Sequence, residues 1–239
     1  MIDDSRAPMT AAQTAASYDE GLRTYFRKIY NTMTAGLLLT GLVAMVCASV
    51  PAIAVLFTKP LFAILFAFLP LILGMTLFNG GALMNKPASS LKARFYIFSA
   101  AFGLCLTPLV LIYAGADLAR AFFVTAATFA GTSLWSYVTK SDLSKFGSFL
   151  FMGVLGLMIA IVVNMFLRSP MMDYIISMAG VLIYTGLVAW DTQNLKESYA
   201  ASSGTEANDK LAIMGALSLY MNFIMLFQFI LRLMGSNRN

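Results

Sequence analysis

The feature that most constrains this chain is a series of seven apolar stretches, each long enough to cross a lipid bilayer. A helix needs about 20 apolar residues to span a hydrocarbon core about 30 Å thick. The stretches show none of the in-and-out alternation that is typical of membrane β-strands. We therefore expect an all-α membrane protein with seven transmembrane helices. These helices are predicted over residues 29–50, 61–84, 95–115, 118–139, 147–167, 172–193 and 211–234.

The composition leaves little room for a second, soluble domain. Apolar residues make up 59% of the 239 residues and charged residues only 11%, whereas about a quarter of a soluble domain is charged. We predict a cytoplasmic N-terminal tail over residues 1–28, one transmembrane domain over 29–234 and a short C-terminal tail over 235–239. Residues 1–28 lack the apolar core and cleavage site of a signal peptide, so we expect this segment to remain on the protein.

The basic residues are distributed unevenly between the two sides of this topology. Of the 16 Lys and Arg residues, eleven fall on the side of the N-terminus and five on the opposite side. The positive-inside rule therefore predicts a cytoplasmic N-terminus and, with seven spans, a C-terminus outside. The net charge of +5 is thus interpreted as a topology signal. We expect the lipid bilayer as the surroundings of this chain and no nucleic acid as a partner.

Asp191 is the main candidate for an acid inside the membrane. It closes the apolar run of the sixth predicted span, and on a helical projection Ser177, Gly180 and Tyr184 fall within about 60° of it. An ionised group inside a bilayer is costly, so its presence calls for an explanation. Two interpretations remain open: Asp191 is an ordinary acid at the cytoplasmic end of its helix, or it belongs to a functional polar face.

The seventh predicted span carries a polar stripe. Ser218, Asn222, Gln228 and Arg232 occupy one arc of about 120° on a helix that is otherwise built of Leu, Ile, Met and Phe. Such a stripe is expected to face protein or a water-filled cavity rather than lipid. The side chains could form interhelical hydrogen bonds, or they could line a path through a bundle in which this helix is central.

Other polar or small residues are interpreted as packing residues. Cys47 and Cys105 lie inside predicted spans and are typical of small apolar packing positions. The fourth predicted span presents hydroxyl groups on one face, which is typical of close helix packing. These hydroxyl residues are Thr125, Thr128, Thr132 and Ser136.

The sequence offers no recognisable catalytic constellation. It contains no His, the commonest general base and a common metal ligand, and it has no Walker loop, HExxH pattern or CxxC pair. An aspartyl intramembrane protease would need two facing acids, and only Asp191 is available. We therefore expect neither an enzyme nor a resident cofactor.

Two segments carry a resemblance to known proteins: YTGLVAWDTQNLKE over residues 184–197, and the stretch from LTPLVLIYAG to VVNMFL over 106–167. They resemble the Bax inhibitor-1, or transmembrane Bax inhibitor motif, family. The resemblance covers residues 20–235, and within the family the chain is similar to a bacterial member. It implies seven helices with the last one enclosed by the other six, and, with the short tails, a bacterial inner membrane location.

The resemblance also implies a functional site. In this family a pair of acids near the cytoplasmic end of the bundle is linked to pH-dependent calcium leak. The first acid matches Asp191, whereas the place of the second is taken by Asn222 within SLYMNFIMLF. Two close carboxylates share a proton, so a lone Asp191 is expected to titrate as a single group. One carboxylate and one amide oxygen would bind Ca²⁺ only weakly and transiently, because calcium takes six to eight oxygen ligands.

Two functions follow as expectations. The first is a passive cation leak, with calcium as the expected cation, gated around Asp191 and the seventh helix. Its predicted ion-pathway or pH-sensing residues are Asp191, Asn222, Ser218, Gln228, Arg232 and Tyr184. The second is a regulator without transport activity that binds a membrane-anchored ATP-dependent protease or another membrane partner, with residues 1–28 as its handle. The sequence leaves ion selectivity and oligomeric state open.

Overall fold

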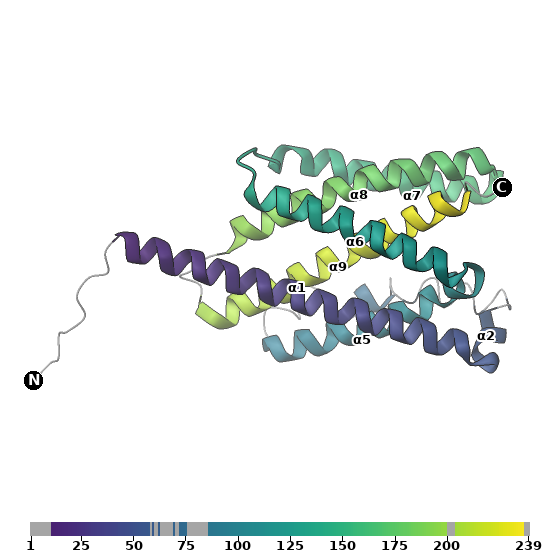
Figure 1. The fold of residues 1–239 in the computed structure, drawn as a ribbon, viewed down its shortest axis with the longest axis horizontal. Coiled ribbons are helices and arrows are strands. Elements are labelled where there is room, and N and C mark those ends of the chain that lie inside the picture. The colour runs from purple at the N-terminus through teal and green to yellow at the C-terminus, as the bar shows by residue number, and fades with distance from the viewer. Residues whose placement is uncertain are drawn as a thin grey trace, which may run out of the picture.

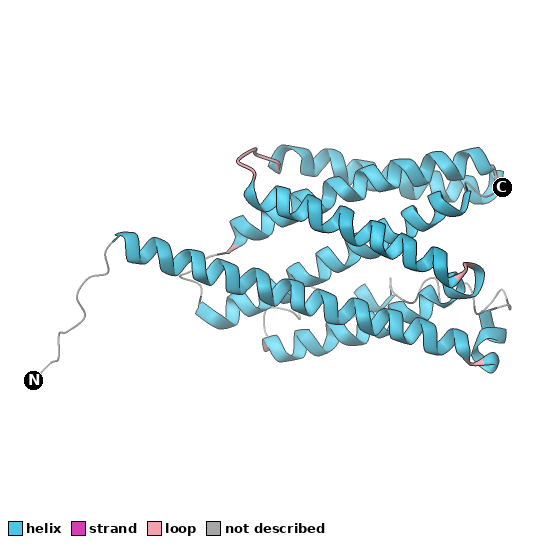
Figure 2. Cartoon of the chain, viewed as in Figure 1, coloured by secondary structure: helices cyan, strands magenta, loops and turns pink. Residues whose placement is uncertain are grey.

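A computed structural model describes residues 11–57, 59, 62, 69, 72–75, 86–199 and 204–236, and every element within them is helical (Figures 1 and 2). This confirms the all-α fold class. The elements are α1 (Ala11–Ser49), α2 (Pro51–Phe57), α5 (Ala88–Ile112), α6 (Gly115–Val138), the 3₁₀-helix η1 (Ser144–Phe146), α7 (Gly147–Leu167), α8 (Pro170–Ser198) and α9 (Gly204–Ser236).

Five of the described helices are long and apolar enough to cross a membrane: α1, α5, α7 with the preceding η1, α8 and α9. The fourth predicted span corresponds to α6, which at 24 residues is long enough, but its hydroxyl residues lower its mean hydropathy. The second predicted span, 61–84, lies mostly outside the described residues. The structure therefore supports a multi-pass membrane protein.

The local sequence explains where α7 ends and where α8 begins. The range of α7 coincides with the prediction, and α7 stops at Arg168, which adopts a left-handed backbone with φ of 51°. Ser169 then caps α8 by accepting a hydrogen bond from the Met172 backbone N–H at 3.4 Å, and Pro170 occupies the first helical turn. Ser and Pro are favoured at these two positions because the first N–H groups of a helix lack partners within it.

The first helix begins earlier than the sequence indicated. α1 starts at Ala11, within the segment expected to be a polar tail up to residue 28. Leu22, Tyr25 and Phe26 are buried in the main apolar cluster of the bundle. Tyr25 and Phe26 meet edge to face, with ring centroids 5.8 Å apart. These contacts show that the packed part of α1 extends beyond its predicted apolar span, 29–50.

The last helix lies inside the bundle. α9 crosses between the pair formed by α1 and α5 and the pair formed by α6 and α8 (Figure 1), and 61% of its apolar window is buried. The corresponding share of α7 is 11%, and α7 packs on α8 rather than on α9. The described helices thus surround α9 closely on four sides, with α7 in an outer position.

Polar contacts join several helices at the end of the bundle where α9 begins. Lys28 lies 2.5 Å from the carboxylate of Asp209, and the Ala88 backbone N–H donates to Glu206 at 2.9 Å. At the same end, the Lys196 ammonium donates to the Tyr137 carbonyl at 2.9 Å. These contacts gather segments of α1, α5, α6, α8 and α9 that the charge pattern had assigned to one face of the membrane.

Candidate functional site

Asp191 lies on the face of α8 that packs against α9. Ser177 and Gly180 are buried on the same face, and Tyr184 stacks at a tilt on Phe229 with ring centroids 5.6 Å apart. A Cβ added at Gly180 would lie 2.5 Å from the Phe229 ring, so only glycine permits this close approach of the two helices. The small and polar face predicted from the sequence is therefore the α8–α9 interface.

Two side chains of α9 hold the Asp191 carboxylate. Ser218 Oγ donates to Asp191 Oδ2 at 2.5 Å, and Asn222 Nδ2 donates to the same oxygen at 2.6 Å. The donors are four residues apart, so they lie on one face of α9, one above the other. Asn222 is only 6% exposed. The structure thus brings together three of the six predicted site residues, and we call Asp191, Ser218 and Asn222 the carboxylate cluster.

The chemistry of the cluster is asymmetric. An ionised carboxylate only accepts hydrogen bonds, so Asn222 presents its amide N–H and keeps its carbonyl oxygen outside this contact. Both donors use Oδ2, and Oδ1 accepts no hydrogen bond from the described residues. Donors of this kind offset part of the cost of burying a charge. The second carboxylate oxygen is left for a proton, water or a cation.

The remaining predicted site residues lie outside the carboxylate cluster. Gln228 and Arg232 are half-buried, and Arg232 is about 15 Å from Asn222 along the axis of α9, since a helix rises 1.5 Å per residue. Between them, Leu226, Ile230 and Leu231 are buried in an apolar cluster that Tyr184 also contacts. The polar stripe of α9 therefore binds Asp191 at one level and is interrupted by packed apolar side chains farther along.

A hydroxyl network beside the cluster was not predicted from the sequence. Tyr30 of α1 and Ser133 of α6 are hydrogen-bonded at 2.5 Å, and Ser133 is hydrogen-bonded to Thr192 of α8 at 3.0 Å. Thr192 directly follows Asp191 in the chain and donates to the Val188 carbonyl at 2.7 Å. The network therefore ties three helices together next to the carboxylate cluster. The hydroxyl face predicted on α6 was the available signal, although Ser133 itself was not assigned to it.

A second buried hydroxyl pair lies on the side of α9 opposite to the carboxylate cluster. Tyr220 is fully buried, and its hydroxyl is hydrogen-bonded to Thr40 of α1 at 2.7 Å. Thr40 is also within 2.9 Å of the Ser99 carbonyl of α5. These bonds tie α9 to α1 and α1 to α5, whereas the carboxylate cluster ties α9 to α8.

The connection between α6 and α7 closes the same end of the bundle. Gln193, two residues after Asp191, accepts from the Leu143 backbone N–H at 2.7 Å and donates to the Ser141 carbonyl at 2.8 Å. Within the loop, Asp142 accepts from the Ser144 backbone N–H at 2.9 Å. Hydrogen bonds from Ser144 hold the pKa of Asp142 below its usual value near 3.8. The Asp142 carboxylate is therefore ionised throughout the neutral range.

The described residues contain no group of three or more His, Cys, Asp or Glu side chains placed to hold a metal ion. The structure forms no disulfide between Cys47 and Cys105, and the Cys105 thiol donates to the Ala101 carbonyl of its own helix at 3.3 Å. Any cation at Asp191 would have to draw most of its ligands from hydroxyl, amide and water oxygens. Such a ligand set suits passage rather than tight storage, because tight calcium sites combine several carboxylates.

The fold and the site define a class: a multi-pass α-helical membrane protein whose innermost helix binds a half-buried carboxylate. The sequence profile of the family described as inhibitors of apoptosis-promoting Bax1 matches residues 22–239. The chain belongs to this Bax inhibitor family, which confirms the resemblance found in the sequence.

Bacterial relatives share nearly the whole chain. It is 42% identical to an uncharacterised protein of Caulobacter vibrioides over 93% of this chain and 92% of the relative. It is 38% identical to an uncharacterised protein of Rickettsia prowazekii over 100% of both chains. It is also 38% identical to the inner membrane protein YbhL of Escherichia coli over 91% of this chain and 94% of the relative.

Proposed function

We propose that this protein is a passive cation leak, with calcium as its cargo, gated by the contact between Asp191 and α9. The observation that carries the proposal is the pairing of the Asp191 carboxylate with Ser218 and Asn222. This pairing joins an acid at the α8–α9 interface to the helix at the centre of the bundle. A group that both attracts cations and holds two helices together suits a gate.

The chemistry supports a cation over an anion as cargo. The carboxylate supplies a negative charge, and the oxygens of Ser218 and Asn222, with the Asp191 Oδ1 that accepts no hydrogen bond from the described residues, together offer several lone pairs. When a cation approaches, the Asn222 side chain can turn its carbonyl oxygen toward the ion, and Ser218 can accept rather than donate. Both exchanges weaken the bonds that hold α8 to α9. Binding of a cation at Asp191 and separation of the two helices are therefore coupled.

The arrangement described above corresponds to a closed state. Beyond Asn222, Leu226 and Phe229 are buried between α9 and its neighbours, and Tyr184 packs on Phe229. Cation passage therefore requires α8 and α9 to separate at this level. Gln228 and Arg232 are proposed to enter the pathway only when these helices have moved.

The membrane setting is part of the proposal. We infer seven spans with the N-terminus in the cytoplasm and the C-terminus outside. α1 ends and α5 begins at opposite ends of the bundle (Figure 1), and basic residues gather at the end that we assign to the cytoplasm. A bacterial inner membrane location is supported by the relative YbhL, an inner membrane protein of Escherichia coli.

The test is calcium flux from proteoliposomes containing the purified full-length chain, measured between pH 6 and 8. We expect Asp191→Ala to change the flux strongly over this range, because it removes both the charge and the link between α8 and α9. Asp173→Asn is the matched control, since Asp173 lies in the first turn of the same helix, at the opposite end. Flux that is identical in the parent protein and Asp191→Ala would refute the proposal.

A non-transporting regulator is the alternative outcome of the same work. It predicts no protein-dependent flux, together with co-purification of a membrane-anchored ATP-dependent protease that is lost when residues 1–28 are deleted. Because the deletion would also remove the buried Leu22, Tyr25 and Phe26, a shorter deletion of residues 1–10 is the cleaner variant.

A further inference from the structure

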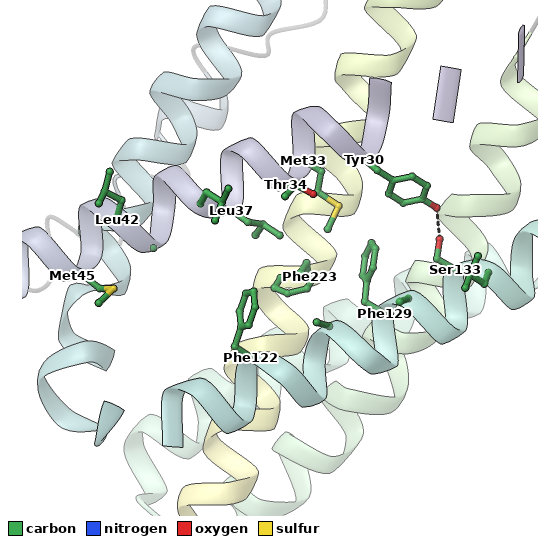
Figure 3. Close-up of a pocket in the computed structure, with 15 residues that line it drawn as sticks. Tyr30, Met33, Thr34, Leu37, Leu42, Met45, Phe122, Phe129, Ser133 and Phe223 are labelled. Carbon is green, nitrogen blue, oxygen red and sulfur yellow. Dashed lines mark hydrogen bonds between the residues drawn. The ribbon is translucent and has the colours of Figure 1, made fainter. Parts of the chain in front are cut away.

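An apolar groove opens between α1 and α6 on the side of the bundle (Figure 3). Its volume is about 730 Å³, and its floor is formed by Phe223 of α9. The rim is strongly exposed: Leu38, Leu42 and Leu134 keep 68%, 62% and 67% of their surface accessible. At one end, the hydrogen-bonded hydroxyls of Tyr30 and Ser133 form the only polar contact drawn among the lining side chains.

The shape of the groove suits a hydrocarbon chain. Along α1 it extends from Tyr30 to Met45, which is about 22 Å at a rise of 1.5 Å per residue. This length exceeds the thickness of one leaflet's hydrocarbon, about 15 Å. A whole helix of that length, about 10 Å across, would occupy about 1,700 Å³, more than twice the volume of the groove. One or two acyl chains are therefore a better match than a helix.

Charge at the polar end decides which lipid fits. An apolar groove alone does not select a lipid, because lipid tails are as apolar as Leu. Arg27 lies one turn before Tyr30 on the same face of α1. Its side chain is exposed and donates a 3.4 Å hydrogen bond to Thr24. Lys140 is exposed just after the end of α6. Two cations therefore lie near the end of the groove that carries the hydroxyls.

We propose that the α1–α6 groove is a binding site for an anionic phospholipid. An acyl chain lies between Phe122, Phe129 and Leu37, and the phosphate lies near Arg27 at the basic end of the bundle. The Tyr30 and Ser133 hydroxyls face the polar start of the chain. This site is distinct from the carboxylate cluster, although Phe223 at its floor directly follows Asn222.

Gly41 provides a direct way to fill the groove. It lines the groove, and a Cβ added there meets no atom within 4 Å, so the side chain of Gly41→Trp begins in open space and is expected to fill the groove. Gly156 of α7 is equally open and lies outside the groove, so Gly156→Trp is a matched control. Ala130→Leu fills the groove from α6 and serves as a second variant if Gly41→Trp does not fold.

The test is native mass spectrometry of the full-length protein in detergent with added phosphatidylglycerol or phosphatidylcholine of identical acyl chains. We expect the parent protein and Gly156→Trp to retain phosphatidylglycerol in preference to phosphatidylcholine. Gly41→Trp should lower this retention about tenfold, a change of about 1.4 kcal/mol. Arg27→Gln should reduce the preference between the two lipids while leaving chain binding intact, whereas Lys145→Gln, a charge removal on η1, should preserve the preference.

Two results would overturn the proposal. Equal retention of phosphatidylglycerol by the parent protein, Gly41→Trp and Ala130→Leu would show that the groove does not hold the lipid. Loss of a dimer in Gly41→Trp with unchanged lipid retention would show that the groove is covered by a second copy of the chain.

Discussion

Ser218 Oγ and Asn222 Nδ2 both donate to a single oxygen of Asp191, at 2.5 and 2.6 Å. Two donors on one acceptor, spaced by one turn of α9, make the carboxylate a fixed link between the central helix and α8. The geometry also makes the two bonds interdependent, because each donor competes for the same lone pairs.

Ser218→Ala is expected to lower the free energy of unfolding by about 1–2 kcal/mol, since hydrogen bonds to a charged group are stronger than neutral ones. The measurement is thermal or denaturant-induced unfolding in detergent. Ser198→Ala is a matched control, because among the described residues the Ser198 hydroxyl bonds within its own helix, to the Asn194 carbonyl. The double variant with Asn222→Ala should deviate from additivity by at least about 0.5 kcal/mol; strict additivity would contradict a shared acceptor.

Asn222→Asp is expected to create a pH dependence that the parent protein lacks. Two carboxylates at this distance would share a proton at low pH and repel each other when both are ionised. Separation of α8 from α9, and with it calcium flux in proteoliposomes, should therefore rise as pH increases from 6 to 8. A flat profile in this variant, alongside measurable parent flux, would argue against gating at this contact. Asn222→Leu, which adds no charge, controls for the loss of the amide.

The loop between α6 and α7 should lose stability in acid, whereas changes of pH within the neutral range should leave it unaffected. Its Asp142 carboxylate has a lowered pKa through its bonds to Ser144. A group with a lowered folded-state pKa stabilises the fold above its usual pKa, and that contribution disappears as pH falls through the folded value. We therefore expect amide exchange over residues 141–147 to be constant between pH 6 and 8, after correction for intrinsic rates, and protection to fall below about pH 4. Asp142→Asn should remove this acid-dependent change.

Gly180→Ala is expected to destabilise the bundle by about 1–3 kcal/mol through overpacking. Its new Cβ would lie 2.5 Å from the Phe229 ring, whereas the Cβ of Gly156→Ala would meet nothing within 4 Å. Comparison of the two unfolding midpoints isolates the packing effect from the change in helix propensity. Similar unfolding midpoints for the two variants would show that α8 and α9 can move apart at Gly180 without a loss of stability.

The resemblance to the family and the helical projection together predicted much of the candidate site. Asp191, Ser218 and Asn222 were assigned from one charge and two polar positions at helical spacing, and the structure brings them into contact. The same projection included Gln228 and Arg232, which lie elsewhere. A projection reports the direction of a side chain around its helix, but not its depth or the neighbour it meets.

What the sequence determined by itself is the class of fold and the approximate position of the described long helices, although α1, α8 and α9 extend beyond their predicted spans. Apolar stretches of bilayer length must form helices because backbone groups in lipid need internal partners, and the α7 boundaries follow directly. Only the tertiary structure decided which faces meet. The burial of Tyr25 and Phe26, the bond between Tyr30 and Ser133 and the groove beside Gly41 depend on helices distant in the chain. In lipid, association depends on close packing rather than on hydrophobicity, and no pattern within a single helix encodes the shape of its neighbour.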